Sequence, residues 1–464
     1  MANYKVVTTI PNEIFRAYDI RGIVGEGFTA DNIYTIGLAL GSAALERKVE
    51  EVVIGRDGRI SGPDLLAALE AGILDTGCNV INIGEVTTPI LYYAACIMKY
   101  QSGFMLSGSH NPPNYNGVKM VLDGETLYAE EIQKIYQRIL AQNFKTGAGK
   151  KQNVEIIDNY ISCVTSDVKL NQRLKVVVDC GNGVGGKVAP KLLRALGCEV
   201  IELYCDVDGR FPNHQPDPSV PENLHDIIAK VKEVKADLGI AFDGDADRLG
   251  IITEQGEAIA ADRLLMLFAV DILTRHPGTP IVYDVKCTKH LAEQIIKHGG
   301  IPIMYKTGHS LTKAKMKESG ALLAGELSGH MFIKERWFGF DDGIYVASRF
   351  LEMLTRKGCK CSEMFVDVPN SVNTPELKIP MAEDKKFGFM ETFAKYAKFP
   401  GAEVNLIDGV RADFSDGFGL MRPSNTSPNL ILRFEGDTQA ALSRIQNLFR
   451  EQLLVLDATL KLPF

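Results

Sequence analysis

Three segments of the chain repeat one order of hydrophobic and polar positions. Each begins with a short apolar run and continues with a polar loop, a stretch of helical periodicity, a glycine and a second apolar run. The first apolar runs, rich in β-branched residues, are residues 52–54, 176–178 and 281–283. A strand, a helix, a glycine stop and another strand are typical of βαβ units in a parallel sheet. The pattern therefore predicts three related α/β domains.

Each repeat also contains a short apolar strand that runs directly into a polar loop. These polar loops are residues 107–112, 243–248 and 325–330. In open α/β sheets, ligands bind at loops beyond the carboxyl ends of the strands. Because the three equivalent loops carry different side chains, we expect them to share one central cleft between domains.

The repeat ends near residue 368, and the remaining segments predict a smaller α+β domain. Its expected strands and helices are residues 376–380, 385–398, 402–414, 429–434 and 438–456. Asp437 precedes the last helix and is the expected N-cap. We therefore expect four domains, at residues 1–154, 155–256, 257–368 and 369–464.

Composition limits the classes of function that fit this chain of 464 residues. A hydrophobic fraction of 45% and a charged fraction of 23% are usual for folded proteins. A net charge of −7 gives no attraction to nucleic acid or to an anionic membrane. The first 21 residues lack a basic segment followed by an apolar one, and the nine cysteines are scattered and cannot all pair. We therefore expect a cytoplasmic protein that binds neither nucleic acid nor membranes.

A glycine-rich segment, residues 181–187, partly matches two nucleotide-binding patterns. Gly181, Gly183 and Gly186 satisfy the G-x-G-x-x-G dinucleotide pattern between a strand and a helix. The segment also fits a P-loop as far as Val188, which stands where that loop needs a serine or threonine for magnesium. We favour a tight turn that opens a helix. A nucleotide-binding protein remains the alternative from another functional class.

Three alternating carboxylates indicate a metal site. Asp243, Asp245 and Asp247 imitate positions 1, 3 and 5 of an EF-hand, but Arg248 replaces the glycine at position 6 and the flanks are strand-like. These departures argue against a calcium EF-hand. Magnesium prefers a few carboxylates together with phosphate oxygens, so the loop favours magnesium.

The other loops supply groups that act on a phosphate ester. Ser109 is a hydroxyl nucleophile once a base or a metal activates it. Residues 326–330 offer acceptors and donors for sugar hydroxyls, and residues 422–428 form a turn rich in phosphate donors. Together these loops indicate phosphoryl transfer on a phosphorylated sugar.

Four segments resemble, in the expected order, the four motifs of the α-D-phosphohexomutase superfamily, in particular of its bacterial phosphomannomutase/phosphoglucomutase members. They read SGSHNP at 107–112, DGDADR at 243–248, GELSGH at 325–330 and RPSNT at 422–426. FRAYDIRG at 15–22 and KTGH at 306–309 extend the resemblance over nearly the whole chain.

The resemblance implies a role for each matching residue. Ser109 would carry a phosphoryl group, and its phosphate would bind magnesium together with Asp243, Asp245 and Asp247. Sugar hydroxyls would be bound by Glu326 and Ser328. The non-reacting phosphate would be held by Arg422, Ser424, Asn425 and Thr426. Further family positions would line the cleft: Tyr18, Arg21, Lys119, Arg248, Lys286, His309 and His330. Catalysis is expected to involve Ser109 and Arg248, with proton transfer by Lys119, His330 or His110.

The implied reaction is the reversible interconversion of hexose 1-phosphate and hexose 6-phosphate, with mannose or glucose as the sugar. A bisphosphorylated sugar would serve as intermediate and activator, and we expect a monomer. Phosphoglucosamine mutase activity is the nearest alternative. Two residues depart from the family pattern. Ser107 replaces a threonine and keeps its hydroxyl, whereas Ala246 replaces a glycine and fits only without a positive φ or a tight contact.

Overall fold

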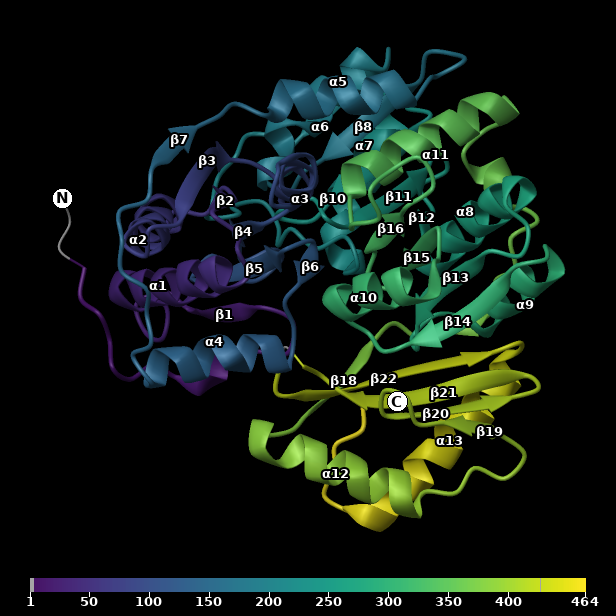
Figure 1. Cartoon of the computed structure of the whole chain (residues 1–464). Coiled ribbons are helices and arrows are strands. Elements are labelled where there is room, and N and C mark those ends of the chain that lie inside the picture. The colour runs from purple at the N-terminus through teal and green to yellow at the C-terminus, as the bar shows by residue number, and fades with distance from the viewer. Residues whose placement is uncertain (1–3, 426) are drawn as a thin grey trace. The chain divides into compact units, whose positions relative to one another are not determined.

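The computed structural model describes residues 4–425 and 427–464. They form two compact units. The first unit comprises residues 4–261 and Ser328–Val366, and the second comprises Asp262–Leu327 and Asp367–Phe464. Figure 1 labels the helices and strands of both units.

The first unit begins with a seven-stranded mixed sheet. Its order is β1-β5-β4-β2-β3-β7, and β6 pairs with β5. Strands β4, β2, β3 and β7 run parallel, whereas β5 is antiparallel to β4 and to β1. The strands are β1 (Ile20–Ile23), β2 (Glu51–Arg56), β3 (Asn79–Glu85), β4 (Gly103–Leu106), β5 (Tyr115–Leu122), β6 (Glu125–Thr126) and β7 (Lys151–Asn153). The predicted apolar run at 52–54 is the buried centre of β2.

Most helices of this part share one large apolar core with the sheet. The helix at residues 88–97 contributes no residue to that core and contacts β2 and β4. Thr29 and Thr87 cap two of the helices, because their side chains accept hydrogen bonds from backbone N–H groups three residues later. The helices are η1 (Asn12–Ile14), α1 (Ala30–Glu46), α2 (Gly62–Leu74), α3 (Thr88–Ile97) and α4 (Glu130–Leu140).

A second mixed sheet follows in the same unit, in the order β12-β11-β10-β8-β9. Strand β8 runs parallel to β9 and β10, and β11 turns back antiparallel to β10. Its elements are α5 (Ile157–Asp167), β8 (Lys175–Asp179), η2 (Val184–Lys187), α6 (Ala189–Ala195), β9 (Glu199–Leu203), η3 (Pro221–Leu224), α7 (His225–Val234), β10 (Leu238–Phe242), β11 (Leu249–Thr253) and β12 (Ala258–Ile259).

The segment after Ser328 also belongs to the first unit. It contains β16 (Met331–Ile333), α11 (Gly343–Lys357) and η4 (Ser362–Phe365). Asp342 caps α11, accepting hydrogen bonds from Tyr345 N and from the hydroxyl of Tyr160, both at 2.9 Å. Helix α11 packs against β10 and β11, so a late part of the chain completes the core around the second sheet.

The second unit contains three parallel strands in the order β14-β13-β15. Its first part comprises α8 (Ala261–Arg275), β13 (Pro280–Asp284), α9 (Lys289–Lys297), β14 (Ile301–Tyr305), α10 (His309–Ser319) and β15 (Leu323–Gly325). The predicted run at 281–283 lies in β13 and is buried.

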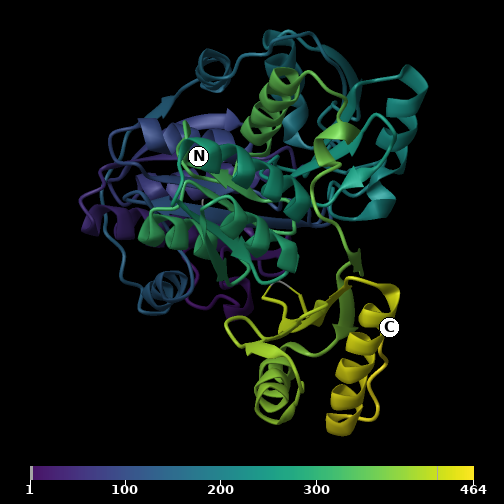
Figure 2. The same ribbon diagram turned by 90° about the vertical axis from the view of Figure 1, so that its right-hand side faces the viewer.

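The last part of the second unit is an antiparallel sheet with two helices on one face, as Figures 1 and 2 show. Its order is β17-β22-β21-β20-β19, and β18 pairs with β22. The elements are β17 (Val372–Asn373), β18 (Leu377–Pro380), α12 (Glu383–Tyr396), β19 (Glu403–Asn405), β20 (Val410–Phe414), β21 (Gly417–Pro423), β22 (Asn429–Gly436) and α13 (Gln439–Leu456).

These elements confirm the predicted fold class of three α/β domains followed by an α+β domain. Three details differ from the prediction. The strand expected at 402–414 is divided into β19 and β20 by a turn, and β21 was not predicted. The N-cap of α13 is Thr438, whose side chain accepts from Ala441 N at 3.2 Å, and not Asp437. Among the described residues, no helix is both long and apolar enough to span a bilayer.

Candidate active site

The loop after β10 gathers three fully buried carboxylates. Asp243, Asp245 and Asp247 are each 0% exposed, and oxygens of all three lie within 4.8 Å of one another. Burial and the charges of the other two aspartates raise the pKa of Asp243 well above its ordinary value. Three buried like charges this close need a cation, so this cluster is the candidate metal centre.

The hydrogen bonds of Asp245 fit the same conclusion. Its Oδ2 accepts from Thr88 Oγ1 at 2.5 Å, from Ser107 Oγ at 2.8 Å and from Lys119 Nζ at 2.7 Å. Its Oδ1 is buried and accepts no hydrogen bond from the described residues. A buried carboxylate oxygen without a donor is costly unless a cation binds it. Magnesium is the cation that suits these hard oxygen ligands.

Lys119 places a positive charge beside the three carboxylates. Its ammonium group also donates to Asp247, and the side chain is 3% exposed. Burial disfavours the charged form, but Asp245 and Asp247 outweigh it and raise the pKa of Lys119 well above its ordinary value. A cation bound by these carboxylates would compete with Lys119 for their oxygens.

Ser109 follows β4 and lies directly against the carboxylates. Its Oγ donates to Asp243 Oδ2 at 2.8 Å and lies 3.2 Å from His110 Nδ1. Ser109 is 2% exposed and has a φ of 47°. A left-handed conformation costs a residue with a Cβ about 1–2 kcal/mol. The loop is therefore held in a conformation that brings the hydroxyl to the metal centre.

His330 and Arg248 form a second group beside the metal loop. Arg248 Nε donates to His330 Nε2 at 3.0 Å, and His330 Nδ1 lies 3.1 Å from Asp341 Oδ2. Burial and the charge of Arg248 hold the pKa of His110 well below its ordinary value. The neutral form of the His110 imidazole is therefore favoured.

Arg21 connects the N-terminal motif to the serine loop. Its guanidinium contacts Asp19 and the side chain of Asn111. Tyr18 precedes β1, the strand that contains Arg21, and is 8% exposed. Ser328 is half-buried in the first unit. All predicted site residues of the first unit except Tyr18 and Ser328 are thus linked to the serine or metal loop by the contacts described above.

In the second unit, Glu326 and Lys286 form separate polar contacts. Glu326 Oε1 accepts from Gly308 N at 3.1 Å and from Thr312 Oγ1 at 2.9 Å, which brings it beside the first turn of α10, where His309 lies. Lys286 Nζ donates to Glu376 Oε1 at 2.6 Å. Burial lowers the pKa of Lys286, but Glu376 and Asp284 reverse this and leave it raised.

The predicted phosphate-binding turn follows β21. Arg422 Nε donates to Asp408 Oδ2 at 2.8 Å, and the same carboxylate oxygen accepts from Thr307 N at 3.0 Å. Ser424 is 5% exposed, and its Oγ accepts from Ser427 N at 3.1 Å. Asn425 is half-buried beside it. Thr426 lies outside the described residues.

Four domain models of one enzyme family match the chain in order. They are the alpha/beta/alpha domains I, II and III and the C-terminal domain of phosphoglucomutase/phosphomannomutase, matched at residues 12–146, 155–256, 260–372 and 376–452. The chain belongs to the phosphoglucomutase/phosphomannomutase family.

Relatives of the same family match almost end to end. A phosphomannomutase/phosphoglucomutase of Pseudomonas aeruginosa is 53% identical over 456 residues, which cover 98% of each chain. A phosphoglucomutase of Neisseria gonorrhoeae is 51% identical and covers 96% of this chain and 97% of its own. A crystal structure of a family protein from Burkholderia thailandensis has 48% identity and a TM-score of 0.94, covering 98% of this chain and 100% of that one. This family member is accordingly a mutase.

In this family member, the glycine-rich segment supports the metal loop. Val184 N donates to Gly244 O at 3.1 Å. A Cβ on Gly183 would lie 2.6 Å from Gly244 O, and one on Gly185 would lie 3.2 Å from the Cβ of Ala246. Gly183 therefore allows the close approach of the Gly244 backbone, and Gly185 that of the Ala246 side chain, in agreement with the tight turn favoured from the sequence.

We expected an alanine at position 246 to fit only without a positive φ or a tight contact, and the structure does not meet this condition. Ala246 has a φ of 60° and is fully buried, and a Cβ added to Gly185 would lie only 3.2 Å from its Cβ. The metal loop therefore tolerates an alanine in a left-handed conformation, because the surrounding packing fixes the backbone there.

Substitutions at positions 246 and 185 test this packing. Ala246→Gly is expected to leave stability unchanged or raise it by up to about 1 kcal/mol, because relief of the left-handed alanine exceeds the added backbone entropy of glycine. Gly185→Ala is expected to lose about 1–3 kcal/mol through overpacking against Ala246. The double variant should recover part of that loss, which calorimetric unfolding of all four proteins would measure. If the changes in unfolding free energy of the two single variants simply added in the double variant, positions 185 and 246 would not interact.

Several residues of the site were not predicted from the sequence. Asp57 and Arg59 contact the serine loop, Asp341 contacts His330, and Asp408 contacts Arg422. Asp57 and Arg59 lie in the polar loop after β2, the first loop of the first repeat, so their position after a buried strand was the available signal.

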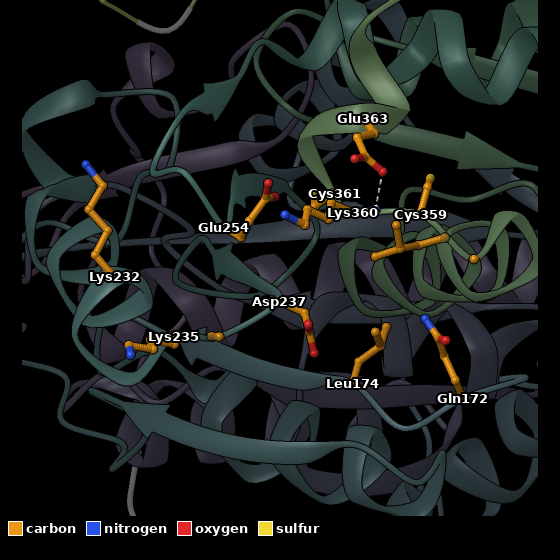
Figure 3. Close-up of a pocket in the computed structure, with 13 residues that line it drawn as sticks. Gln172, Leu174, Lys232, Lys235, Asp237, Glu254, Cys359, Lys360, Cys361 and Glu363 are labelled. Carbon is orange, nitrogen blue, oxygen red and sulfur yellow. Dashed lines mark hydrogen bonds between the residues drawn. The ribbon is translucent and has the colours of Figure 1, made fainter.

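A pocket of about 680 Å³ lies elsewhere in the first unit, as Figure 3 shows. Its walls include Lys232, Asp237, Glu254, Lys360 and Cys361. The lining carboxylates have local roles: Glu254 accepts from Ser362 N at 3.0 Å, and Asp237 accepts from a backbone N–H. No lining residue belongs to the predicted site, so this pocket is not the candidate active site.

Proposed function

We propose that this phosphoglucomutase/phosphomannomutase family member reversibly converts hexose 1-phosphates into hexose 6-phosphates through a phosphorylated Ser109. The observation that carries the proposal is the 2.8 Å contact between the buried Ser109 hydroxyl and Asp243 of the carboxylate cluster. Mannose and glucose phosphates are the proposed substrates, because the Pseudomonas aeruginosa relative is named phosphomannomutase/phosphoglucomutase and the Neisseria gonorrhoeae relative phosphoglucomutase.

The proposed reaction has two transfers. In the first, the bond between phosphorus and Ser109 Oγ breaks, and a bond forms between phosphorus and the free 1- or 6-oxygen of the bound sugar phosphate. The sugar hydroxyl loses its proton to a neighbouring base, and the product is a bisphosphorylated sugar. In the second, the bond between the other phosphorus and its sugar oxygen breaks, a bond forms between that phosphorus and Ser109 Oγ, and the base returns its proton to the freed sugar oxygen. We propose the same bisphosphate as the activator that phosphorylates a free Ser109.

Residues of the first unit would direct the transfer. Asp243, Asp245 and Asp247 would hold magnesium, which when bound offsets the negative charge of the moving phosphoryl group. His110, Lys119 and His330 are the proposed proton carriers, since each lies within this group of contacts. Arg248 would hold His330 through the 3.0 Å bond at Nε2. Tyr18, Arg21 and Ser328 are proposed to contact the substrate.

Residues of the second unit would bind the sugar and its non-reacting phosphate. Glu326 would accept hydrogen bonds from sugar hydroxyls. Arg422 would bind the phosphate through its guanidinium, which Asp408 orients by accepting from Nε at 2.8 Å. The proposed ligands in this unit are Lys286, His309, Glu326, Arg422, Ser424, Asn425 and Thr426. We also propose that the enzyme is a monomer.

Two measurements test the proposal. Intact mass analysis of the active, purified protein should find one phosphoryl group, and peptide mapping should place it on Ser109. A coupled assay should show turnover of mannose and glucose 1-phosphates that depends on magnesium and is stimulated by hexose 1,6-bisphosphate. Preferred turnover of glucosamine 1-phosphate would reassign the sugar, and fully active protein without phosphate on Ser109 would contradict the mechanism.

A further inference from the structure

Arg59 uses its whole guanidinium to hold the loop that carries Ser109. Nη2 donates to Ser109 O at 2.7 Å and to Asn111 O at 2.6 Å. Nη1 donates to Pro112 O at 2.6 Å and to Tyr115 O at 3.0 Å. Nε donates to Asp57 Oδ2 at 3.2 Å. A guanidinium has five N–H donors, so each of them has a partner, and four partners are backbone carbonyls of residues 109–115.

Asp57 holds the beginning of the same loop. Its Oδ2 accepts from Gly108 N at 3.0 Å and from Ser107 Oγ at 2.9 Å, and its Oδ1 accepts from Arg59 N at 3.1 Å. Asp57 and Arg59 are 2% and 1% exposed. The two side chains therefore form one buried ion pair that binds the loop on both sides of Ser109.

The fit between Arg59 and the loop leaves no room for a side chain at position 108. A Cβ on Gly108 would lie 2.3 Å from Arg59 Nε and 2.4 Å from the guanidinium carbon. The ring of Phe211 lies 5.2 Å from the same carbon. The guanidinium is thus enclosed between Gly108 and an aromatic ring, and its plane is fixed.

Pairing with Asp57 balances the charge of Arg59, but it does not explain why Arg59 also binds four carbonyls of the serine loop. Asp57 satisfies only one of the five donors, whereas the other four bind carbonyls of a loop in which Ser109 has a φ of 47°. Unfavourable backbone conformations persist where the surrounding structure fixes them, and they gather at functional sites. Lysine cannot reproduce these contacts, because its ammonium has three donors and no planar fork.

We propose that Arg59, together with Asp57, is a positioning residue for phosphoryl transfer at Ser109. It fixes the carbonyls of residues 109 and 111, and thereby directs the Ser109 Oγ toward Asp243. This role rests on the function proposed above. It predicts that loss of the guanidinium lowers the rate of transfer and leaves sugar phosphate binding nearly intact.

The test compares Arg59→Lys with Arg349→Lys. Arg349 is a matched control because it is also 1% exposed in the first unit, and it donates to Glu335 O at 3.0 Å and to Tyr345 Oη at 3.0 Å, outside the serine loop. Both variants are expected to lower the unfolding temperature. Only Arg59→Lys should lower kcat, by about a hundred-fold, because small misplacements of a reacting group have effects of that size. KM for the sugar phosphate should change less than about three-fold.

Single-turnover transfer from phosphorylated Ser109 to glucose 1-phosphate is the decisive readout. Slow transfer in Arg59→Lys with normal transfer in Arg349→Lys supports the proposal. Normal transfer in a folded Arg59→Lys protein, or equal loss in both variants, overturns it. If the wild-type protein itself shows no transfer from Ser109, the proposed function is wrong. If only the positioning role is wrong, the wild-type protein transfers the phosphoryl group and Arg59→Lys does so equally well.

Gly108→Ala decides the question if Arg59→Lys does not fold. The added methyl displaces the guanidinium without changing any charge, so the same pattern of reduced kcat and preserved KM is expected. Wild-type transfer rates in a folded Gly108→Ala protein would overturn the proposal.

Discussion

Ser109→Ala is expected to remove turnover of hexose 1-phosphates, with kcat at least about a thousand-fold below wild type. The Ser109 hydroxyl is the one that contacts Asp243. The neighbouring hydroxyl of Ser107 donates toward Asp57 and Asp245 and accepts from Ser109 N, so it is not placed to replace it. A coupled assay measures the loss, and intact mass analysis should find no phosphoryl group on the variant.

Two further variants make the Ser109 experiment specific. Ser109→Gly removes the same hydroxyl but suits a φ of 47°, so it should be as inactive as alanine and more stable than Ser109→Ala. Ser102→Ala is the matched control, because Ser102 is buried in the same domain and its Oγ donates to Tyr100 O at 2.7 Å. Its kcat should equal that of wild type. Residual turnover within ten-fold of wild type in Ser109→Ala would refute Ser109 as the phosphoryl carrier.

Asp243→Asn is expected to lower kcat by about a hundred-fold or more and to abolish stabilisation by magnesium. A ligand present at a hundred times its Kd stabilises a protein by about 2.7 kcal/mol. Wild-type protein should therefore unfold at a higher temperature with magnesium, and the variant should show no such shift. Asp237→Asn is the control, because Asp237 is an exposed carboxylate of the same domain. A full magnesium shift in Asp243→Asn would contradict the assigned centre.

Without magnesium, the same substitution should not destabilise the protein at neutral pH. Burial and the neighbouring aspartates raise the pKa of Asp243 in the folded state. A carboxyl group whose pKa is raised by folding stabilises the fold only when protonated, so this contribution is lost as the pH rises above its unfolded pKa of about 3.9. Asparagine stays neutral at every pH. The variant without metal should therefore unfold at pH 7 at a temperature equal to or above that of wild type.

The three repeated domains were predictable because their central strands are buried on both faces. Such strands are continuous apolar runs, and each ends in a polar loop that is visible in the sequence. The same signal located Ser109, Asp243 and Glu326. The last domain was less regular, since a turn divides its expected strand at 402–414 and Thr438 takes the capping position expected for Asp437.

For residues outside the recognised motifs, the sequence indicated at most a position after a buried strand, and not the contact partner. Arg59 binds carbonyls, which every residue has, so neither spacing nor residue type in the loop 107–112 indicates its partner. Asp341 and Asp408 reach the predicted site residues His330 and Arg422 only after folding. Ala246 shows another limit: its φ of 60° could not be predicted from the residue type, and its neighbour Gly185 lies in a different segment.

The division of the chain into two units determines how the protein can be dissected. The chain passes between the units three times, at 261–262, 327–328 and 366–367. A protein truncated after residue 261 would lack α11, which packs against β10 and β11, and would expose that apolar surface. Chimeras with other family members should therefore exchange residues 262–327 and 367–464 as a pair. A single crossover at any domain boundary would leave one unit with parts from two parents.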